Sequence, residues 1–221
     1  MHKRLLLLSH IDNLPDPNSA LEEPNGLVAI SEQLTLKHLK KAYSTGIFPW
    51  YSEGEPVMWW SPDPRAVLFV HDYKPNKRFI RFLKASHWRV TFNHAFEQVV
   101  RQCAVREEGT WISAEIIKYY TALAKKGMAS SVEVWDDEQL IGGLYGIHQG
   151  KVFCGESMFS IKSNASKVAF HSMVQEFKLL GGELIDCQIL NPHTESLGAI
   201  EIPRSEFLYY LKMYQNQDVR F

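Results

Sequence analysis

The segment from residue 131 to residue 190 constrains the fold more than any other part of the chain. Three strand-like stretches, 131–135, 140–148 and 151–158, follow one another with only short polar turns between them. Turns of this length join neighbouring antiparallel strands. A helical pattern at 164–180 and a buried strand pattern at 184–190 come next, separated by two glycines. The segment therefore predicts an antiparallel meander, a helix packed on it and a further strand.

The rest of the chain adds shorter elements around this unit. Residues 12–30 are rich in Pro, Asn, Asp and Gly, which predicts an irregular loop. Prolines among the aromatic residues of 46–60 argue against a regular helix or a central strand there. We expect a boundary near Pro62, with a small N-terminal domain at 1–62 and a larger domain at 63–221. The other expected elements are a helix at 35–46, a strand at 66–70, a helix at 76–85, a strand at 88–92, a helix capped by Asn93 and ending near Cys103, a helix from Ser113 to Gly127, a cap at Asn164 for the helix at 164–180, and a closing helix at 204–215.

This order predicts an α+β fold, with a mixed, mostly antiparallel sheet flanked by helices. The larger domain resembles the GNAT-type acyltransferase fold. Members of that fold that use acetyl-coenzyme A are similar to one another in a Gln/Arg-x-x-Gly-x-Gly/Ala turn, whose backbone N–H groups hold pyrophosphate at a helix N-terminus. The corresponding residues here, 160–165, contain no glycine. A GNAT-like domain with this turn is predicted to use an acyl donor other than coenzyme A.

The composition excludes several classes of protein. The 221 residues carry a formal net charge of -1, so contact with a nucleic acid needs a local basic patch. Three cysteines without a C-x-x-C pair are typical of a reduced, cytoplasmic protein. Nine histidines without an H-E-x-x-H motif or a Cys/His cluster predict no metal site. The leucine run after Met1–Arg4 is too short for an export signal, and no segment is long enough to span a bilayer.

Two polar residues interrupt the predicted strand at 184–190. Asp186 and Gln188 are two positions apart, so their side chains are expected on the same face. A buried carboxylate and amide are unfavourable unless they have partners. The pair is therefore either a catalytic site or a structural network that holds a neighbouring loop. Glu156, which follows Gly155 on the strand expected to be adjacent, favours a site, because an acid there can recognise a cationic substrate group.

Two further features indicate contact with a nucleic acid. The stretch from residue 74 to residue 89 contains no acidic residue, and four basic side chains of its helix share one face. Such a stripe either binds phosphates or is an ordinary solvated helix face. Trp50 and Trp111 lie in predicted loops, where an indole can stack on an unpaired base. The predicted phosphate-binding residues are Lys74, Lys77, Arg78, Arg81 and Lys84.

Taken together, these motifs resemble the bacterial leucyl/phenylalanyl-tRNA-protein transferase family, in consistent order over about positions 23 to 204. The resemblance implies an enzyme that moves Leu or Phe, and less readily Met, from aminoacyl-tRNA to the α-amino group of proteins that begin with Arg or Lys. The product carries an N-end rule degradation signal. The implied architecture is a small N-terminal domain and a GNAT-like domain, with no metal and no cofactor. The matching strings are Glu23–Leu27, Gly46–Trp50, Trp59–Arg65, Glu107–Ile112, Gly142–Gly146, Phe153–Ser160, Asn164–Lys167, Ile185–Gln188, His193–Ala199 and Glu201–Arg204.

The resemblance also assigns roles to single residues. Trp50 and Trp111 would hold the 3′-terminal adenosine of the tRNA, and the basic helix would bind its acceptor stem. Glu156 would meet the Arg or Lys side chain of the acceptor protein. Leucine at 144 and methionine at 173 depart from the methionine and the aromatic residue of relatives, which keeps the pocket apolar and leaves its Leu-to-Phe preference open. The pocket for the transferred side chain would be lined by Leu144, Phe153, Met158, Phe170, Met173 and Ile185.

The implied reaction is aminolysis of an activated ester by an α-amine. That amine has a pKa of about 7.7 to 8.0, so an appreciable fraction is neutral near physiological pH. An Asp of ordinary pKa, about 3.9, would remove a proton from the ammonium only at a cost of about 5.5 kcal/mol. Correct placement alone contributes about 7 to 11 kcal/mol. We therefore expect Asp186 and Gln188 to position and polarise the amine, unless a raised pKa makes Asp186 the base.

Two other functions remain compatible with the sequence. A GNAT enzyme could use another acyl donor, coenzyme A included, or could transfer an amino acid from tRNA to peptidoglycan. A non-catalytic RNA-binding module could use the basic helix and the tryptophans without any transfer. Transfer from purified Leu-tRNA to a peptide that begins with Arg distinguishes these functions.

Overall fold

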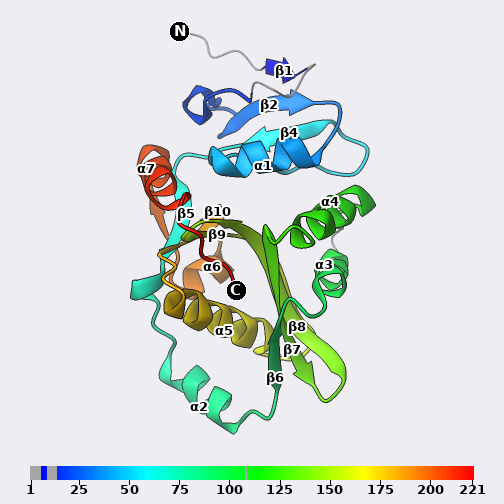
Figure 1. Ribbon diagram of the computed structural model, residues 1–221, viewed down its shortest axis with the longest axis vertical. Coiled ribbons are helices and arrows are strands. Elements are labelled where there is room, and N and C mark those ends of the chain that lie inside the picture. The colour runs from blue at the N-terminus through cyan, green and yellow to red at the C-terminus, as the bar shows by residue number, and fades with distance from the viewer. Residues whose placement is uncertain (1–5, 9–13, 108) are drawn as a thin grey trace.

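The computed structural model describes residues 6–8, 14–107 and 109–221. It contains two sheets, and Figure 1 draws the smaller, N-terminal sheet above the larger one. The sequence predictions for the leucine-rich start, including Met1–Arg4 and the end of its apolar run at 9–12, lie outside the described residues.

The N-terminal sheet has four strands in the order β1-β2-β4-β3. β1 (Leu6–Leu8) is parallel to β2 (Leu27–Ser31), whereas β4 (Val57–Trp60) is antiparallel to β2 and to β3 (Phe48–Pro49). α1 (Leu36–Ser44) lies between this sheet and the larger one (Figure 1). The helix predicted at 35–46 is confirmed as α1. Thr35 caps it, and its buried side, with Leu39 and Tyr43, joins the core.

Two sequence predictions are wrong in this region. Residues 27–30 belong to strand β2 and are not an irregular loop, because the side chains of Leu27, Val28 and Ala29 are buried. Residues 57–60 form a strand with neighbours on both sides, although prolines argued against a central strand. The reason is position: Pro56 and Pro62 flank β4, and Pro49 lies in β3 at the edge of the sheet, where a missing N–H is tolerated.

The larger sheet has seven strands in the order β11-β5-β10-β9-β8-β7-β6. Every neighbouring pair is antiparallel except β9 and β10, which are parallel. The predicted meander is confirmed as β7-β8-β9, and so is the mixed, mostly antiparallel sheet of an α+β fold. The strands are β5 (Arg65–Phe69), β6 (Arg89–Phe92), β7 (Ala129–Asp136), β8 (Gln139–Gln149), β9 (Val152–Ser160), β10 (Leu184–Gln188) and β11 (Ile200–Ile202).

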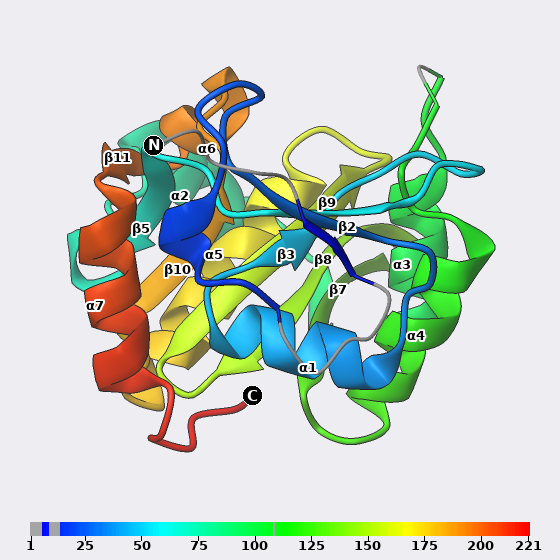
Figure 2. The same cartoon turned by 90° about the horizontal axis from the view of Figure 1, so that it is seen from above.

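Helices cover both faces of the larger sheet (Figures 1 and 2). α5 and α2 pack on one face, and α3 and α4 pack with α1 on the other, so the sheet separates two apolar clusters. The second cluster includes the face of α2 that lies opposite its basic residues, with Phe79 buried and Phe82 and Leu83 half-buried. The remaining helices are α2 (Lys77–Ala85), α3 (Phe96–Ala104), α4 (Ala114–Ala124), α5 (Ala165–Leu179), α6 (Pro192–Ser196) and α7 (Arg204–Tyr214), with short 3-10 turns at Pro17–Ser19 and Val70–Asp72.

The predicted helix caps have mixed outcomes. Ser113 caps α4 as expected and accepts a hydrogen bond from the Ile116 N–H at 3.3 Å. Asn93 does not cap α3, which begins three residues later; its side chain bonds Ser131 and Phe221 instead. Asn164 precedes α5 but makes no side-chain cap bond, because it is in the left-handed conformation, with φ of 73°.

The chain leaves the N-terminal sheet after Trp60 and enters the larger sheet at Arg65. One apolar cluster contains side chains from both regions, including Trp59 and Tyr145. The division of the chain into domains at residue 62 therefore stays a prediction.

Close packing of α5 on the meander gives a test of the fold. A Cβ atom at Gly142 of β8 would lie 2.5 Å from the Cβ of Ala165 at the start of α5. We expect Gly142→Ala to displace α5 and to lower the free energy of unfolding by about 2 kcal/mol, measured by urea denaturation. Gly155→Ala is the matched control, because the nearest atom there would be 3.8 Å away. Equal losses in the two variants would contradict this packing.

Candidate active site

A cavity of about 480 Å³ lies where the end of β3 faces the larger sheet. Its wall comes from the β3 end, the loop between α3 and α4, strands β8, β9 and β10, helix α5 and the segment around α6. Of the predicted catalytic and substrate-binding residues, only Asp186 is not part of this wall. The predicted residues that line it are Trp50, Trp111, Leu144, Phe153, Glu156, Met158, Phe170, Met173, Ile185 and Gln188.

The six predicted pocket residues form one apolar part of this wall. Strand register brings four of them together: Ile185 lies opposite Phe153 across β10 and β9, and Leu144 lies opposite Met158 across β8 and β9. Phe170 and Met173 come from α5, whose first turns pack against these strands. Side chains of this kind can take up an apolar group and remove it from water.

The two tryptophans singled out in the sequence line the same cavity from different elements. Trp50 follows β3, and its side chain is 47% exposed. Its backbone carbonyl accepts a hydrogen bond from Trp60 Nε1 at 2.7 Å, and the two indoles meet edge to face. Trp111 is half-buried and meets the ring of Tyr120 edge to face, 6.5 Å away. Both indoles are therefore held by neighbours that belong to the protein core or its margin.

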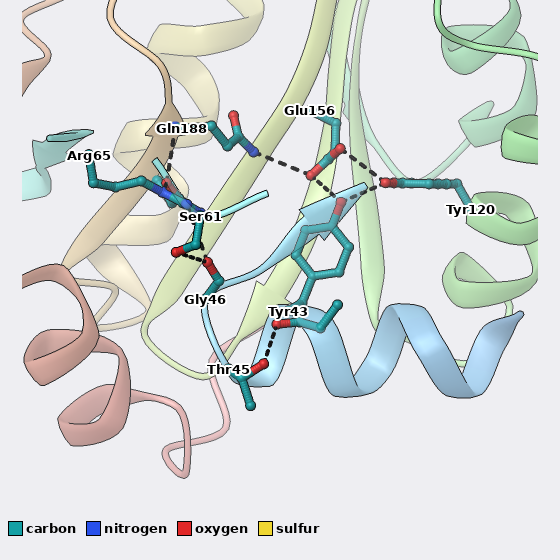
Figure 3. Close-up of polar contacts among 10 residues, drawn as sticks. Tyr43, Thr45, Gly46, Ser61, Arg65, Tyr120, Glu156 and Gln188 are labelled. Atoms are coloured by element: carbon teal, nitrogen blue, oxygen red, sulfur yellow. Dashed lines mark hydrogen bonds and ion pairs between the residues drawn. The ribbon is translucent and has the colours of Figure 1, made fainter. Parts of the chain in front are cut away.

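Glu156 is half-buried in the cavity wall and is held by two tyrosines (Figure 3). Its Oε1 accepts a hydrogen bond from the Tyr43 hydroxyl at 2.7 Å, and its Oε2 accepts one from the Tyr120 hydroxyl at 3.1 Å. Gln188 donates to Oε1 through Nε2 at 3.4 Å. The carboxylate thus joins the N-terminal region, α4 and β10 at a single point.

Burial raises the pKa of Glu156 from 4.5 to about 7. The tyrosine hydrogen bonds oppose this shift, and the carboxylate of Asp186 adds to it. Near neutral pH Glu156 is therefore close to the midpoint of its titration, about half protonated and half charged. A cation placed beside it would shift this equilibrium toward the charged form.

Asp186 is buried and forms a two-pronged ion pair with Arg65. Arg65 Nε donates to Oδ1 at 2.8 Å, and Nη2 donates to Oδ2 at 2.7 Å. Arg65 Nη1 also donates to the carbonyl of Gly46 at 3.2 Å, and Oδ1 accepts the backbone N–H of Gln188 at 3.0 Å. Both carboxylate oxygens are therefore already occupied, which favours an orienting role for Asp186 over that of a proton acceptor.

The backbone changes direction directly after Asp186. The pairing of β10 with β5 shifts register between Asp186 and Gln188, and Gln188 has a left-handed φ of 59°. The N–H bond to Oδ1 holds this turn, and the side chain of Gln188 reaches toward Glu156 (Figure 3). One alternative for the polar pair, a structural network, is therefore present, and it positions Gln188, which lines the cavity. A catalytic role for the pair stays a prediction. The predicted strand at 184–190 ends at Gln188 because the backbone turns there.

Several residues of this arrangement are not singled out by the sequence analysis. Tyr43 and Tyr120 lie on the buried faces of their helices, where the pattern alone indicates ordinary core positions. Arg65 appears only within a matching string, and its pairing with Asp186 spans 121 positions. Arg106 and His193 also line the cavity. No local motif distinguishes Arg106, and His193 appears only at the start of a matching string.

Two family models match this chain. Residues 67–212 match the model of the leucyl/phenylalanyl-tRNA protein transferase, and residues 32–63 match the model of that protein's N-terminal domain. The chain belongs to the leucyl/phenylalanyl-tRNA-protein transferase family. It is therefore an aminoacyltransferase, as the sequence resemblance predicts.

Relatives with this name are similar over nearly the whole chain. A leucyl/phenylalanyl-tRNA–protein transferase of Pectobacterium carotovorum is 53% identical over 91% of this chain and 87% of the relative. Those of Klebsiella pneumoniae and of Escherichia coli O81 are 51% and 53% identical, over 95% and 94% of this chain and 91% and 90% of the relatives. Among solved structures, the chain is similar to a GCN5-related N-acetyltransferase from Kribbella flavida, with a TM-score of 0.36 and 11% identity over 78% of this chain and 63% of that one.

The predicted tRNA-binding residues of this transferase lie outside the cavity. All five are exposed, four of them on α2 and Lys74 just before it, at the end of the molecule away from the N-terminal sheet (Figure 1). Within the described residues, no carboxylate forms an ion pair with them. The stripe is thus available to an anion, and tRNA binding there stays a prediction. These residues are Lys74, Lys77, Arg78, Arg81 and Lys84.

The described part of the transferase has neither a cluster of metal ligands nor a helix that could span a membrane. No group of three or more His, Cys, Asp or Glu side chains in it could hold a metal ion. In the same part of the chain, none of the helices has the length and apolar character needed to cross a membrane.

The buried ion pair predicts a large loss of stability when one partner is removed. Arg65→Met leaves the Asp186 carboxylate buried without its counter-ion, so we expect the free energy of unfolding to fall by about 3 to 5 kcal/mol. The double variant Arg65→Met/Asp186→Asn should lose less than the sum of the single losses, measured by urea denaturation. Arg101→Met is the control, because its pair with Glu97 is exposed and should contribute less than about 0.5 kcal/mol. Additive losses at 65 and 186 would contradict the coupling.

The raised pKa of Glu156 predicts a pH-dependent stability. The folded state binds this proton up to about pH 7, whereas the unfolded state releases it near pH 4.5. The stabilisation is therefore fully present below about pH 4.5 and is lost as the pH rises through about 7. Over that interval the unaltered protein should lose on the order of 2 kcal/mol relative to Glu156→Gln, measured as the difference between their denaturation curves. A constant difference across the interval would be incompatible with the shift.

Proposed function

We propose that this protein transfers Leu or Phe, and less readily Met, from aminoacyl-tRNA to the α-amino group of proteins that begin with Arg or Lys. One observation carries the proposal: a single cavity combines an apolar wall, two tryptophans and the Glu156–Gln188 pair. These three surfaces match the acyl side chain, the terminal adenosine and the cationic acceptor of that reaction. Membership of the transferase family supports the same function.

The donor would occupy the side of the cavity between the tryptophans and the apolar wall. Trp50 and Trp111 offer indole faces to the terminal adenine, and stacking of a base on an aromatic side chain contributes about 1 to 3 kcal/mol. The ester-linked Leu or Phe would then place its side chain against the apolar part of the cavity wall. The body of the tRNA would bind the basic stripe on α2, where exposed Lys and Arg side chains neutralise phosphates of the acceptor stem.

The acceptor would enter at Glu156. A guanidinium or ammonium group beside this carboxylate favours its charged form, so binding of an Arg or Lys side chain draws Glu156 away from its protonated state. Tyr43 and Tyr120 restrict the carboxylate to one orientation. An apolar N-terminal residue supplies no such cation, which explains discrimination in favour of Arg and Lys.

In the reaction, the α-amine of the acceptor attacks the ester carbonyl carbon. A C–N bond forms, the C–O bond to the ribose breaks, and the proton lost by the amine passes to the departing ribose oxygen through the neighbouring hydroxyl. Gln188 donates to Glu156 through its N–H, which leaves its amide oxygen to accept a hydrogen bond from the incoming amine. Asp186 and Arg65 fix the backbone of Gln188, so their contribution to the reaction is to position this residue.

The product would be a protein with a bulky apolar N-terminal residue, the signal that the N-end rule reads for degradation. Because aminoacyl-tRNA is the donor, we assign the enzyme to the cytoplasm. The chemistry uses an already activated ester, so neither a metal nor coenzyme A is needed for the transfer itself.

The proposal predicts transfer of radiolabelled Leu or Phe from purified tRNA to peptides that begin with Arg or Lys, and none to a peptide that begins with Ala. Gln188→Ala should reduce single-turnover transfer about ten- to hundredfold at saturating tRNA, because one hydrogen bond to the reacting amine is lost. Gln139→Ala, an exposed residue of β8, is the control.

Other outcomes would identify the competing functions. Binding of tRNA without loss of the amino acid, with every peptide supplied, would indicate a non-catalytic RNA-binding module. Acyl transfer from coenzyme A but not from Leu-tRNA would indicate a different GNAT activity. Unchanged transfer by both Gln188→Ala and Asp186→Ala would remove the two residues from the catalytic step.

A further inference from the structure

Arg106 is the one Lys or Arg side chain among the described residues that line the cavity. It follows α3 and lies in the same loop as Trp111, which faces the same cavity. No motif in the sequence indicates a role for Arg106, and the proposed transfer chemistry does not use it. The side chain is exposed, so it is accessible to a ligand at the cavity.

The guanidinium of Arg106 is held in a fixed orientation. Its Nε donates to the carbonyl of Cys103 at 3.3 Å, and its Nη2 donates to the Ser157 hydroxyl at 2.7 Å. An arginine has five N–H donors, so three remain, including both on Nη1. Because these two hydrogen bonds already restrict the guanidinium group, less conformational entropy is lost when a ligand binds to the remaining donors.

The charge of Arg106 has no counter-ion in the described part of the chain. Three other arginines differ in this respect: Arg65 pairs with Asp186, Arg101 with Glu97 and Arg220 with Asp218. The contacts of Arg106 are a carbonyl and a hydroxyl, which are both neutral. An unpaired, oriented guanidinium beside an open cavity is suited to an anion with two oxygens in one plane, such as a phosphate.

We propose that Arg106 binds the phosphate that joins the terminal adenosine of the donor tRNA to the preceding nucleotide. The inference rests on the proposed function, because that function puts the adenine at Trp50 and Trp111. The 5′ phosphate lies one sugar away from the base, and Arg106 shares its loop with one of the two stacking residues. An adenosine held at the base by Trp111 and at the phosphate by Arg106 has its ester fixed in direction as well as position.

Two donors that differ only in this phosphate test the inference. One is the Phe ester of adenosine, and the other is the Phe ester of cytidylyl-(3′→5′)-adenosine, which carries the phosphodiester. The KM of the unaltered enzyme should be about tenfold lower for the dinucleotide, and in Arg106→Gln the ratio of the two KM values should fall to about one. Arg106→Lys should retain part of the ratio, since it keeps the charge but not the fork. Arg101→Gln, an exposed arginine of α3 outside the cavity, should keep the full ratio.

Other results would overturn the inference. An equal rise in KM for both donors in Arg106→Gln would mean that the arginine shapes the cavity without binding phosphate. A change confined to the KM of the peptide would mean that it binds an acidic group of the acceptor. Ser157→Ala, which frees the guanidinium, should lower the donor ratio partially, and an unchanged ratio would contradict its orienting role.

A binding measurement separates failure of this inference from failure of the proposed function. Tryptophan fluorescence titrations with adenosine and with unesterified cytidylyl-adenosine need no transfer. Tighter binding of the dinucleotide that is lost in Arg106→Gln would support the phosphate site even if no peptide were modified. Equal binding of both probes, with transfer intact, would reject the phosphate site and leave the proposed function standing.

Discussion

The ion pair between Arg65 and Asp186 is the interaction on which the rest of this structure depends. It joins β5 to β10 in the larger sheet, and the third donor group of the guanidinium reaches the Gly46 carbonyl at the entrance to the N-terminal sheet. Taking two charges out of water is unfavourable, and this pair offsets the penalty through two parallel hydrogen bonds and the rings of Phe48 and Phe207 near the guanidinium. The same carboxylate then holds the backbone turn that directs Gln188 into the cavity.

Glu156 shows how the two halves of the chain share one site. Its carboxylate lies on β9, and the hydroxyls that hold it come from α1 and α4 on the same side of the sheet. Burial alone would favour a neutral acid, whereas the two tyrosines favour the charged one, and the balance leaves the pKa at about 7. A carboxylate in this balance is sensitive to one additional charge, which supports the proposal that Glu156 recognises a cationic acceptor. The loop that carries Trp111 and Arg106 forms another part of the wall of the same cavity.

The part of the larger sheet whose pairing is predictable from local patterns is the part in which strands and turns are adjacent in the sequence. The meander at 131–158 and the helix that follows are examples, since short turns leave few ways to pair these strands. The N-terminal sheet is less predictable. β2 and β4 pair across an intervening helix and a hairpin, and each is short and lies beside turn-forming residues that locally indicate a loop. Asn93 illustrates the same limit, because distant Ser131 and Phe221 offset its local preference for a cap.

The sequence by itself determined the polar pair on β10 and the family, because strand alternation and ordered motifs are local properties that a chain carries unfolded. The apolar residues that line the cavity were expected only from the resemblance to that family. Only the tertiary structure decided the partners. Asp186 meets an arginine 121 positions away, and Glu156 meets a tyrosine 113 positions away. These contacts make Asp186 the carboxylate whose oxygens are both occupied by an arginine. They make Glu156 the carboxylate that faces the cavity with a pKa of about 7. Ionisation depends on burial and on neighbouring charges, and both exist only after distant segments have packed together.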